Sequence, residues 1–191
     1  MLRVMLVDDS RKDVSLLKES LSAAGYDVVE VSTSAVALLD RVAALQPDVI
    51  IIDSDSPTRD TLEQLAFVNA MQPRPIVMFT EDRDNVTIQA AIRAGVTAYI
   101  VAGMQPERLA PILDVAVARF EQERVLREEL KSVHERLAER KVIERAKGIL
   151  IKQKGMTEEE AFALIRKMAM DRSRKLADVA QQIIDVAELL G

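Results

Sequence analysis

Short apolar and β-branched runs alternate with amphipathic helical patterns from the N-terminus to about residue 105. Three of the runs are continuously apolar, which is typical of strands that are covered on both faces. Between the runs, apolar residues recur at helical spacing, as at Val14, Leu17 and Leu21. The five runs are Arg3–Val7, Asp27–Val31, Val49–Ile52, Ile76–Phe79 and Ala98–Val101. This alternation predicts an α/β domain with a doubly wound, five-stranded parallel sheet.

The alternation stops at Pro106, and good helix formers dominate the following segment. The segment predicts one long helix, with a kink or a restart at Pro111. Four apolar residues in it follow one another at steps of four and three residues, between charged flanks: Leu126, Leu130, Val133 and Leu137. This spacing is that of a coiled-coil seam and predicts a dimer through a linker helix over 121–137. The alternative is a helix that packs back on its own domain.

The end of the chain predicts a small helical bundle. Gly155 ends the long helix, and Thr157 with Glu160 forms a capping box that opens the next helix. A last helix carries apolar residues between positions 176 and 190. The predicted organisation is therefore a first domain over 1–120, a coiled-coil linker helix over 121–137 and a three-helix domain over 131–191.

Composition narrows the chemistry that the chain could carry out. Its 191 residues include no cysteine and a single histidine, His134. Disulfides, thiolate zinc sites and cysteine nucleophiles are therefore excluded, and imidazole-rich metal sites or histidine-based catalysis are not expected. The formal net charge of −5 divides into −8 over residues 1–130 and +3 over residues 131–191. A mildly basic tail on an acidic body indicates separate partners for the two parts.

The chain also lacks the patterns of a secreted or membrane-bound protein. Its apolar start meets two aspartates at Asp8 and Asp9, too soon for a signal peptide. No stretch approaches the roughly eighteen apolar residues of a transmembrane helix. We therefore expect a cytoplasmic protein without membrane contact.

Carboxylates gather at one predicted edge of the sheet. Asp8 and Asp9 end the first strand, Asp53 ends the third, and Thr80 ends the fourth. Ligands collect at the carboxyl ends of the strands in a doubly wound sheet, and three converging carboxylates would repel one another unless a hard cation such as Mg²⁺ lay among them. The alternative for the acidic pair is a cap, by Asp9 or Ser10, for the following helix.

These residues together resemble the receiver domain of bacterial response regulators, over about residues 1–120. The resemblance implies a flavodoxin-like fold in which Asp8, Asp9 and Asp53 hold Mg²⁺. It also implies that Asp53 accepts a phosphoryl group, that Thr80 hydrogen-bonds to it, and that Tyr99 is an aromatic switch residue. The family places a lysine just after the fifth strand, where this chain has Ala102. Because that cation would stabilise the phosphoryl charge, its absence indicates a degenerate receiver whose input is a protein partner.

The tail resembles the ANTAR domain, an RNA-binding antitermination module, over about residues 131–190. The resemblance rests on Ala146 to Leu150, Glu160 to Phe162, Leu164 to Arg166, Ala169-Met170 and Lys175 to Ala180. We expect RNA contacts from Lys147, Gly148, Lys152, Arg172, Arg174 and Lys175, because cations neutralise phosphates. For Gly148 the alternative is tight packing against a neighbouring helix, and for the cations it is a solvated face. The spacing of Phe162 from Ile165 places this only aromatic of the tail in the core, so extensive base stacking is not expected.

The whole chain resembles the AmiR/NasT class of antiterminators, and within it the nitrate-assimilation branch, the NasT type. This resemblance implies a non-enzymatic protein that binds leader RNA with tandem stem-loops, as a homodimer through the coiled coil when active. It also implies a nitrate-sensing partner protein of the NasS type that holds the regulator inactive. Two alternatives remain: a phosphorylation-switched, DNA-binding response regulator of a two-component system, and a signalling adaptor without a nucleic-acid target.

Overall fold

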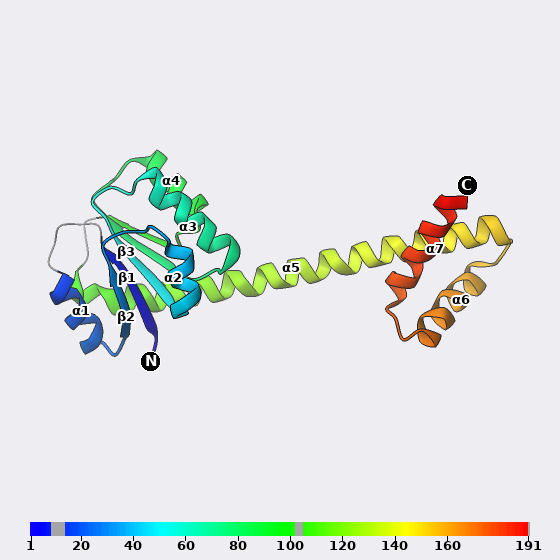
Figure 1. Cartoon of the computed structure of the whole chain (residues 1–191), viewed down its shortest axis with the longest axis horizontal. Helices are drawn as coiled ribbons and strands as arrows, with labels where there is room; N and C mark the ends of the chain where they lie inside the picture. Colours follow the sequence, from blue (N-terminus) through cyan, green and yellow to red (C-terminus); the bar gives the residue numbers. More distant parts are fainter. Residues whose placement is uncertain (9–13, 102–104, 191) are drawn as a thin grey trace. The chain divides into compact units, whose positions relative to one another are not determined.

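The computed structural model describes residues 1–8, 14–101 and 105–190 of the chain (Figure 1). The chain divides into two compact units, Met1–Arg124 and Val125–Gly191. One long helix, α5 (Pro106–Lys154), contributes residues to both units. No helix in the described ranges has an apolar stretch that could cross a bilayer.

The first unit is built on five parallel strands: β1 (Arg3–Asp8), β2 (Asp27–Ser32), β3 (Val49–Asp53), β4 (Ile76–Thr80) and β5 (Ala98–Val101). The strands lie in the order β2-β1-β3-β4-β5, and each neighbouring pair is parallel. The predicted doubly wound five-stranded sheet is confirmed, with the strands at the apolar runs of the sequence.

Helices cover both faces of this sheet (Figure 1). One face packs against α1 (Val14–Ala23) and the first part of α5, and the other against α2 (Leu38–Leu45), α3 (Arg59–Met71) and α4 (Asn85–Arg93). Successive residues of β3 face opposite sides: Ile50 and Ile52 join the α2–α4 core, and Ile51 joins the α1–α5 core. Because both faces are covered, every residue of β3 and β4 is buried, which explains the continuously apolar runs.

Helix α5 runs without a break through Pro111, so the expected restart of the helix is not seen. The proline lies in the second turn, where its missing N–H removes a single helical hydrogen bond, to the carbonyl of Glu107. Three residues in this first part of the helix, Leu109, Leu113 and Ala116, are buried against the sheet.

The second unit consists of the end of α5, α6 (Glu158–Asp171) and α7 (Leu176–Leu190). Its apolar core is drawn from all three helices: Ala146, Leu150, Ala161, Ile165, Ala169, Val179, Ala180 and Ile184. Gly155 follows α5 with a positive φ of 66°, a conformation that glycine adopts without strain. The Thr157 hydroxyl accepts from the backbone N–H of Glu160, whose carboxylate accepts from that of Thr157. The predicted helix end and capping box are confirmed.

Candidate functional site

Two of the three predicted metal-binding carboxylates lie side by side in the sheet. Asp8 ends β1, Asp53 ends the neighbouring β3, and the two residues are register partners. Both are buried, at 2% and 5% exposed. Asp9, the third residue of the predicted set, lies outside the described residues. Within the described ranges no three acidic, histidine or cysteine side chains are grouped closely enough to hold a metal.

Thr80 ends β4 and lies on the far side of β3 from β1. Its hydroxyl donates to the carbonyl of Asp55 at 3.0 Å and accepts from the backbone N–H of Asp82 at 3.1 Å. The side chain is buried, and it ties the loop after β3 to the loop after β4. The predicted switch hydroxyl therefore ends the strand next to that of Asp53, and it is already engaged by the backbone of both loops.

Tyr99 on β5 is the second predicted switch residue. Its ring packs partly buried against the core on the α2–α4 face, and its hydroxyl donates to the carbonyl of Asp82 at 3.1 Å. Burial raises the pKa of the phenol above its ordinary value of 10.0, and the Asp82 carboxylate raises it further. Tyr99 is thus held by the same loop that Thr80 binds.

Asp82 organises that loop, although the sequence analysis did not identify it as a functional residue. Its carboxylate accepts from the backbone N–H of Asp84 at 2.8 Å and from the Ser56 hydroxyl at 2.9 Å. These hydrogen bonds, the one from Asp84 first, lower the pKa of the Asp82 carboxyl below its ordinary value. Its only sequence signal is a position two residues before the N-cap of α4, Asp84, where short polar side chains often bond to the backbone.

In the second unit, Lys147 lies in an ion-pair network. Its ammonium is 2.8 Å from a carboxylate oxygen of Glu144 on α5 and 2.7 Å from one of Glu158 on α6, and the residue is only 7% exposed. The hydrogen bonds to Glu144 and Glu158 raise the pKa of Lys147, and the Lys147 hydrogen bond lowers the pKa of Glu158. An RNA contact by Lys147 remains a prediction, and it would require this network to rearrange.

Gly148 lies on the exposed side of α5. A Cβ built there would meet no atom of the described chain within 4 Å. Tight packing of Gly148 against a helix of its own chain is therefore wrong. Contact of Gly148 with RNA remains a prediction.

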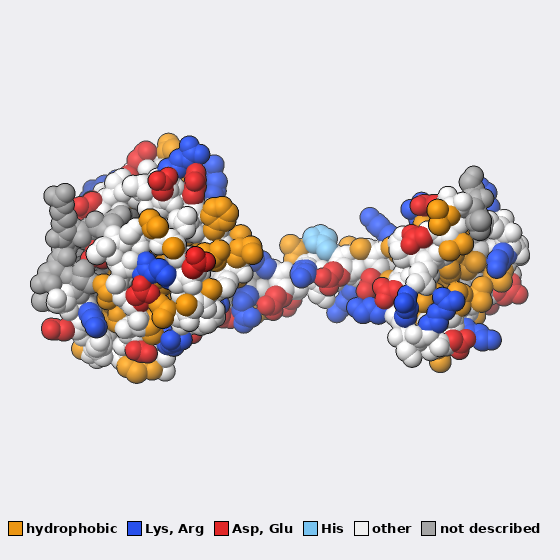
Figure 2. Space-filling model, viewed as in Figure 1, with side chains coloured by type: hydrophobic (Ala, Val, Ile, Leu, Met, Phe, Trp, Pro, Cys, Tyr) orange, Lys and Arg blue, Asp and Glu red, His pale blue; other side chains and the backbone are white. Residues whose placement is uncertain are grey.

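The other predicted RNA-binding cations are exposed. Lys152 lies in the last turns of α5, Arg172 follows α6, and Arg174 and Lys175 lie in the turn before α7. Figure 2 shows basic side chains at several places on the visible face of this unit, with apolar and acidic ones between them. On this face the basic side chains therefore do not form one continuous surface.

Phe162 is not a core residue, contrary to the expectation from its spacing. It is 42% exposed and lines an open hollow with Lys147, Thr157, Glu158 and Glu159. The buried stripe of α6 consists of Ala161, Ile165 and Ala169, at steps of four residues, with Leu164 and Met168 partly buried beside it. Phe162 lies at the edge of this stripe and so reaches the surface.

The predicted coiled-coil seam is open to solvent. Leu126, Leu130, Val133 and Leu137 are 50–59% exposed. In the described structure the seam therefore does not pack back on its own domain. Apolar side chains in a row on an exposed helix are typical of a surface that pairs with another helix.

Comparisons with known proteins match both units. Residues 4–114 match the response regulator receiver domain, and residues 131–184 match the ANTAR domain. The chain is 32% identical over 183 residues to the transcriptional regulatory protein PdtaR of Mycobacterium tuberculosis, which covers 96% of this chain and 89% of that protein. A shorter match, 41% identical over 61 residues, relates it to the nitrate regulatory protein of Klebsiella oxytoca and covers 32% of this chain and 15% of that protein.

Solved structures resemble the first unit. The signal receiver domain of a modulated diguanylate cyclase from Desulfovibrio desulfuricans has a TM-score of 0.57 and 25% identity, and covers 64% of this chain and 98% of its own. The chemotaxis protein CheY4 of Vibrio cholerae has a TM-score of 0.53 and 28% identity, and covers 61% and 98%. The chain belongs to the response regulators that join a receiver domain to an ANTAR domain, a non-enzymatic class of RNA-binding transcription antitermination regulators.

Proposed function

We propose that this protein binds paired hairpins in a leader RNA and prevents transcription termination there. The observation that carries the proposal is the match of residues 131–184 with the ANTAR domain, which implies binding to RNA hairpins. The exposed Lys152, Arg172, Arg174 and Lys175 support it, because they can neutralise backbone phosphates. Gly148 supports it as well, since its open side lets a phosphate backbone approach the helix closely.

The active form in this proposal is a homodimer. Its support is the row of exposed apolar residues from Leu126 to Leu137, which a second copy of the helix would cover. Two tails in one dimer suit two adjacent hairpins. The domain limits that go with the proposal are 1–120 for the receiver, 121–137 for the linker helix and 131–191 for the RNA-binding part.

Receiver domains commonly bind Mg²⁺ at their acidic site. In this chain we assign that role to Asp8, Asp9 and Asp53. The supporting observation is that Asp8 and Asp53 are buried register partners, because two carboxylates forced together in a low dielectric favour a divalent cation with oxygen ligands. When bound, Mg²⁺ would neutralise these carboxylates. Asp53 is the proposed phosphoacceptor, and Thr80 and Tyr99 the proposed switch residues.

We propose that this receiver is controlled mainly by binding of a protein partner and not by phosphorylation. Ala102 stands where the receiver family has its lysine, so a main source of positive charge for a phosphoryl group is missing. The proposed partner is a nitrate sensor of the NasS type, and the regulated genes serve nitrate or nitrite assimilation. The 61-residue match with the Klebsiella nitrate regulatory protein supports this finer assignment.

A binding experiment tests the RNA proposal. The full-length chain is used to select an RNA from a pool of two adjacent stem-loops with fixed stems and randomised loops. The affinity for this selected RNA is then compared with that for duplex DNA of the same length over a series of salt concentrations. We expect a preference for the RNA that persists as salt rises. Salt-dependent binding without preference, or failure to select any RNA, would refute the proposal, and a preference for the duplex would favour a DNA-binding regulator.

A further inference from the structure

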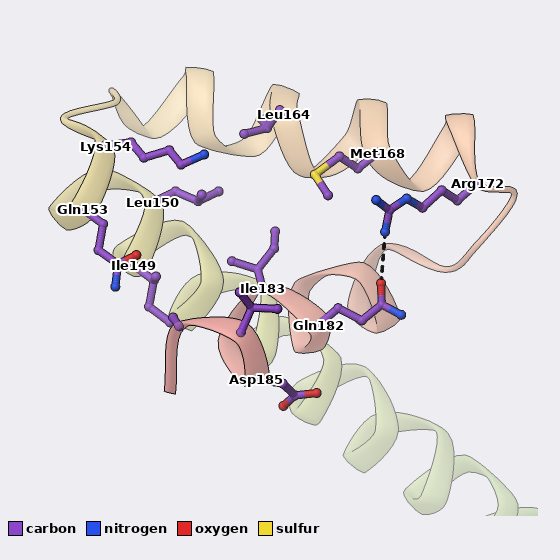
Figure 3. A pocket seen from close by; sticks show the side chains of 12 residues that line it. Ile149, Leu150, Gln153, Lys154, Leu164, Met168, Arg172, Gln182, Ile183 and Asp185 are labelled. Atoms are coloured by element: carbon purple, nitrogen blue, oxygen red, sulfur yellow. Dashed lines mark hydrogen bonds between the residues drawn. The ribbon is translucent and has the colours of Figure 1, made fainter. Parts of the chain in front are cut away.

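A cavity of about 570 Å³ lies within the second unit, between the end of α5, α6 and α7 (Figure 3). Its walls are mainly apolar and come from all three helices: Ile149, Leu150, Leu164, Met168 and Ile183. Cavities of this size and character commonly hold small organic groups. This cavity belongs to neither the receiver pocket nor the coiled-coil seam.

Polar side chains surround these apolar walls. Gln153 and Lys154 extend from the end of α5, and Arg172 and Gln182 lie across the cavity from them (Figure 3). Asp185 on α7 also lines the cavity, and its carboxylate accepts a hydrogen bond from Gln181 Nε2 at 2.7 Å. Arg172 Nη1 donates to Gln182 Oε1 at 3.3 Å, so the guanidinium is held at the edge of the cavity. An amide both donates and accepts, so Gln182 can pair with another group while it holds Arg172.

Apolar walls with amides and cations around them fit a nucleobase better than any other chemical group of an RNA loop. A nucleobase has flat apolar faces and an edge of hydrogen-bond donors and acceptors, and it is flanked by phosphates. Proteins recognise RNA loops by taking up unstacked bases, which rest on aromatic rings or on arginine guanidinium planes and hydrogen-bond along their edges. The cavity offers apolar side chains and the Arg172 guanidinium for the faces, Gln153 and Gln182 for the edge, and Lys154 for a flanking phosphate.

We propose that an unstacked base of a hairpin loop enters this cavity and that Arg172 and Gln182 recognise it. The inference rests on the proposed RNA function and adds a site of base recognition to it. It also explains how the tail could hold a base although Phe162 is its only aromatic residue. Aliphatic walls and a guanidinium replace the aromatic platform. An apolar side chain of a second copy would use neither the amides nor the cations.

The test uses the selected two-hairpin RNA and the full-length chain. Each loop nucleotide is replaced in turn by an abasic nucleotide, and the affinity of the wild-type chain is measured. We expect one loop position at which loss of the base weakens binding by about 5- to 150-fold, the range for one recognised base. Val186→Trp places a large ring at the wall of the cavity, and Gln182→Ala removes the amide. In both variants the intact RNA should bind correspondingly more weakly, and the abasic change at that position should have little further effect.

Matched controls lie outside the cavity. Leu189→Trp adds the same ring on α7 at a residue that is 85% exposed and does not line the cavity. Gln89→Ala in the first unit removes an amide that likewise accepts from an arginine, Arg93. Circular dichroism checks that all four variants fold. If Val186→Trp and Leu189→Trp bind the intact RNA equally well, RNA binding stands and the base site is wrong. If Val186→Trp instead changes the oligomeric state in sedimentation and leaves the affinity unchanged, the cavity receives a second copy and the inference is likewise overturned.

Discussion

The Lys147 ammonium on α5 lies 2.7 Å from a carboxylate oxygen of Glu158, the first residue of α6. This contact crosses the turn at Gly155 and complements the capping box that starts α6. Lysine at this position therefore has a structural role within the unit, whatever its role toward RNA. A negative charge at the first turn of a helix is itself favourable, so Glu158 serves two purposes.

The Lys147–Glu158 contact predicts a pH dependence for the stability of α6. The pKa of Glu158 in the folded chain is below its ordinary 4.5, so the contact stabilises the folded state above that pH. The stabilisation is lost as the pH falls through the lowered folded-state pKa. We expect Glu158→Gln to reduce the hydrogen-exchange protection of α6 amides at neutral pH, with a smaller difference from wild type in acid.

Glu159→Gln is the control for this measurement, because it removes a neighbouring charge from the same first turn without touching Lys147. Equal effects of the two variants at every pH would show that the contact adds nothing beyond the helix dipole. The raised pKa of Lys147 acts in the alkaline range: its contribution is present below the ordinary 10.5 and is lost as the pH rises through the higher folded-state pKa.

Replacing Leu130 and Val133 with lysine is expected to convert a dimer into monomers. Each of these side chains, if fully buried in a dimer, contributes roughly 1.5–3 kcal/mol before the cost of association. Analytical ultracentrifugation of the full-length variant gives the mass directly. The control is Glu128→Lys with Glu129→Lys, which adds the same residue type beside the seam. A wild-type mass distribution in the seam variant would contradict the dimer surface as drawn.

The predicted cations are expected to differ in their contribution to RNA binding. Alanine at Lys152, Arg172, Arg174 or Lys175 should flatten the dependence of log affinity on log salt by about one unit per lost phosphate contact. Arg172→Ala should in addition relax the preference at one loop position, because it borders the cavity. The measurement is the affinity for the selected RNA over a salt series. If all four variants keep the wild-type affinity and salt slope, the RNA contacts other residues of the chain.

Asp53→Ala is expected to leave RNA binding unchanged, because Ala102 makes phosphorylation of this receiver a poor switch. The same substitution should remove most of the rise in the unfolding temperature that Mg²⁺ gives the wild-type chain, since bound metal stabilises the folded state. Affinity for the selected RNA and thermal unfolding with and without Mg²⁺ are the two measurements. A folded Asp53→Ala chain that no longer binds RNA would show that RNA binding depends on Asp53 and would contradict this prediction.

Gly148→Ala is expected to make the isolated chain more stable and its complex with RNA weaker. An added Cβ meets nothing in the chain, and alanine in a helix is favoured over glycine by roughly 0.5–1 kcal/mol. A methyl group on this open side would obstruct a backbone that approaches closely. Thermal unfolding and RNA affinity of the same variant test both parts, and sedimentation distinguishes an obstructed RNA from an obstructed second helix.

Local patterns predicted the strands, the end of α5 at Gly155 and the capping box, because each depends on residues that are near in sequence. The positions of Lys147 and Phe162 could not be predicted in this way. Whether a residue at the edge of a helical stripe is covered depends on how α5 and α6 pack, and this placed a lysine inside and a phenylalanine outside. The cavity is lined by residues far apart in the sequence, such as Gln153 of α5 and Gln182 of α7, and no local pattern records that they share one cavity.

The hydroxyl of Thr80 holds the carbonyl of Asp55 and the amide of Asp82 at once. The same two loops are also joined by the Ser56 hydroxyl, which donates to the Asp82 carboxylate, and by the Glu81 N–H, which donates to the Asp55 carbonyl. A ligand that takes over the Thr80 oxygen would therefore release one contact to each loop and leave the loops connected. Because Tyr99 also donates to the Asp82 carbonyl, such a ligand would change how Thr80 is bonded without freeing the loop after β4.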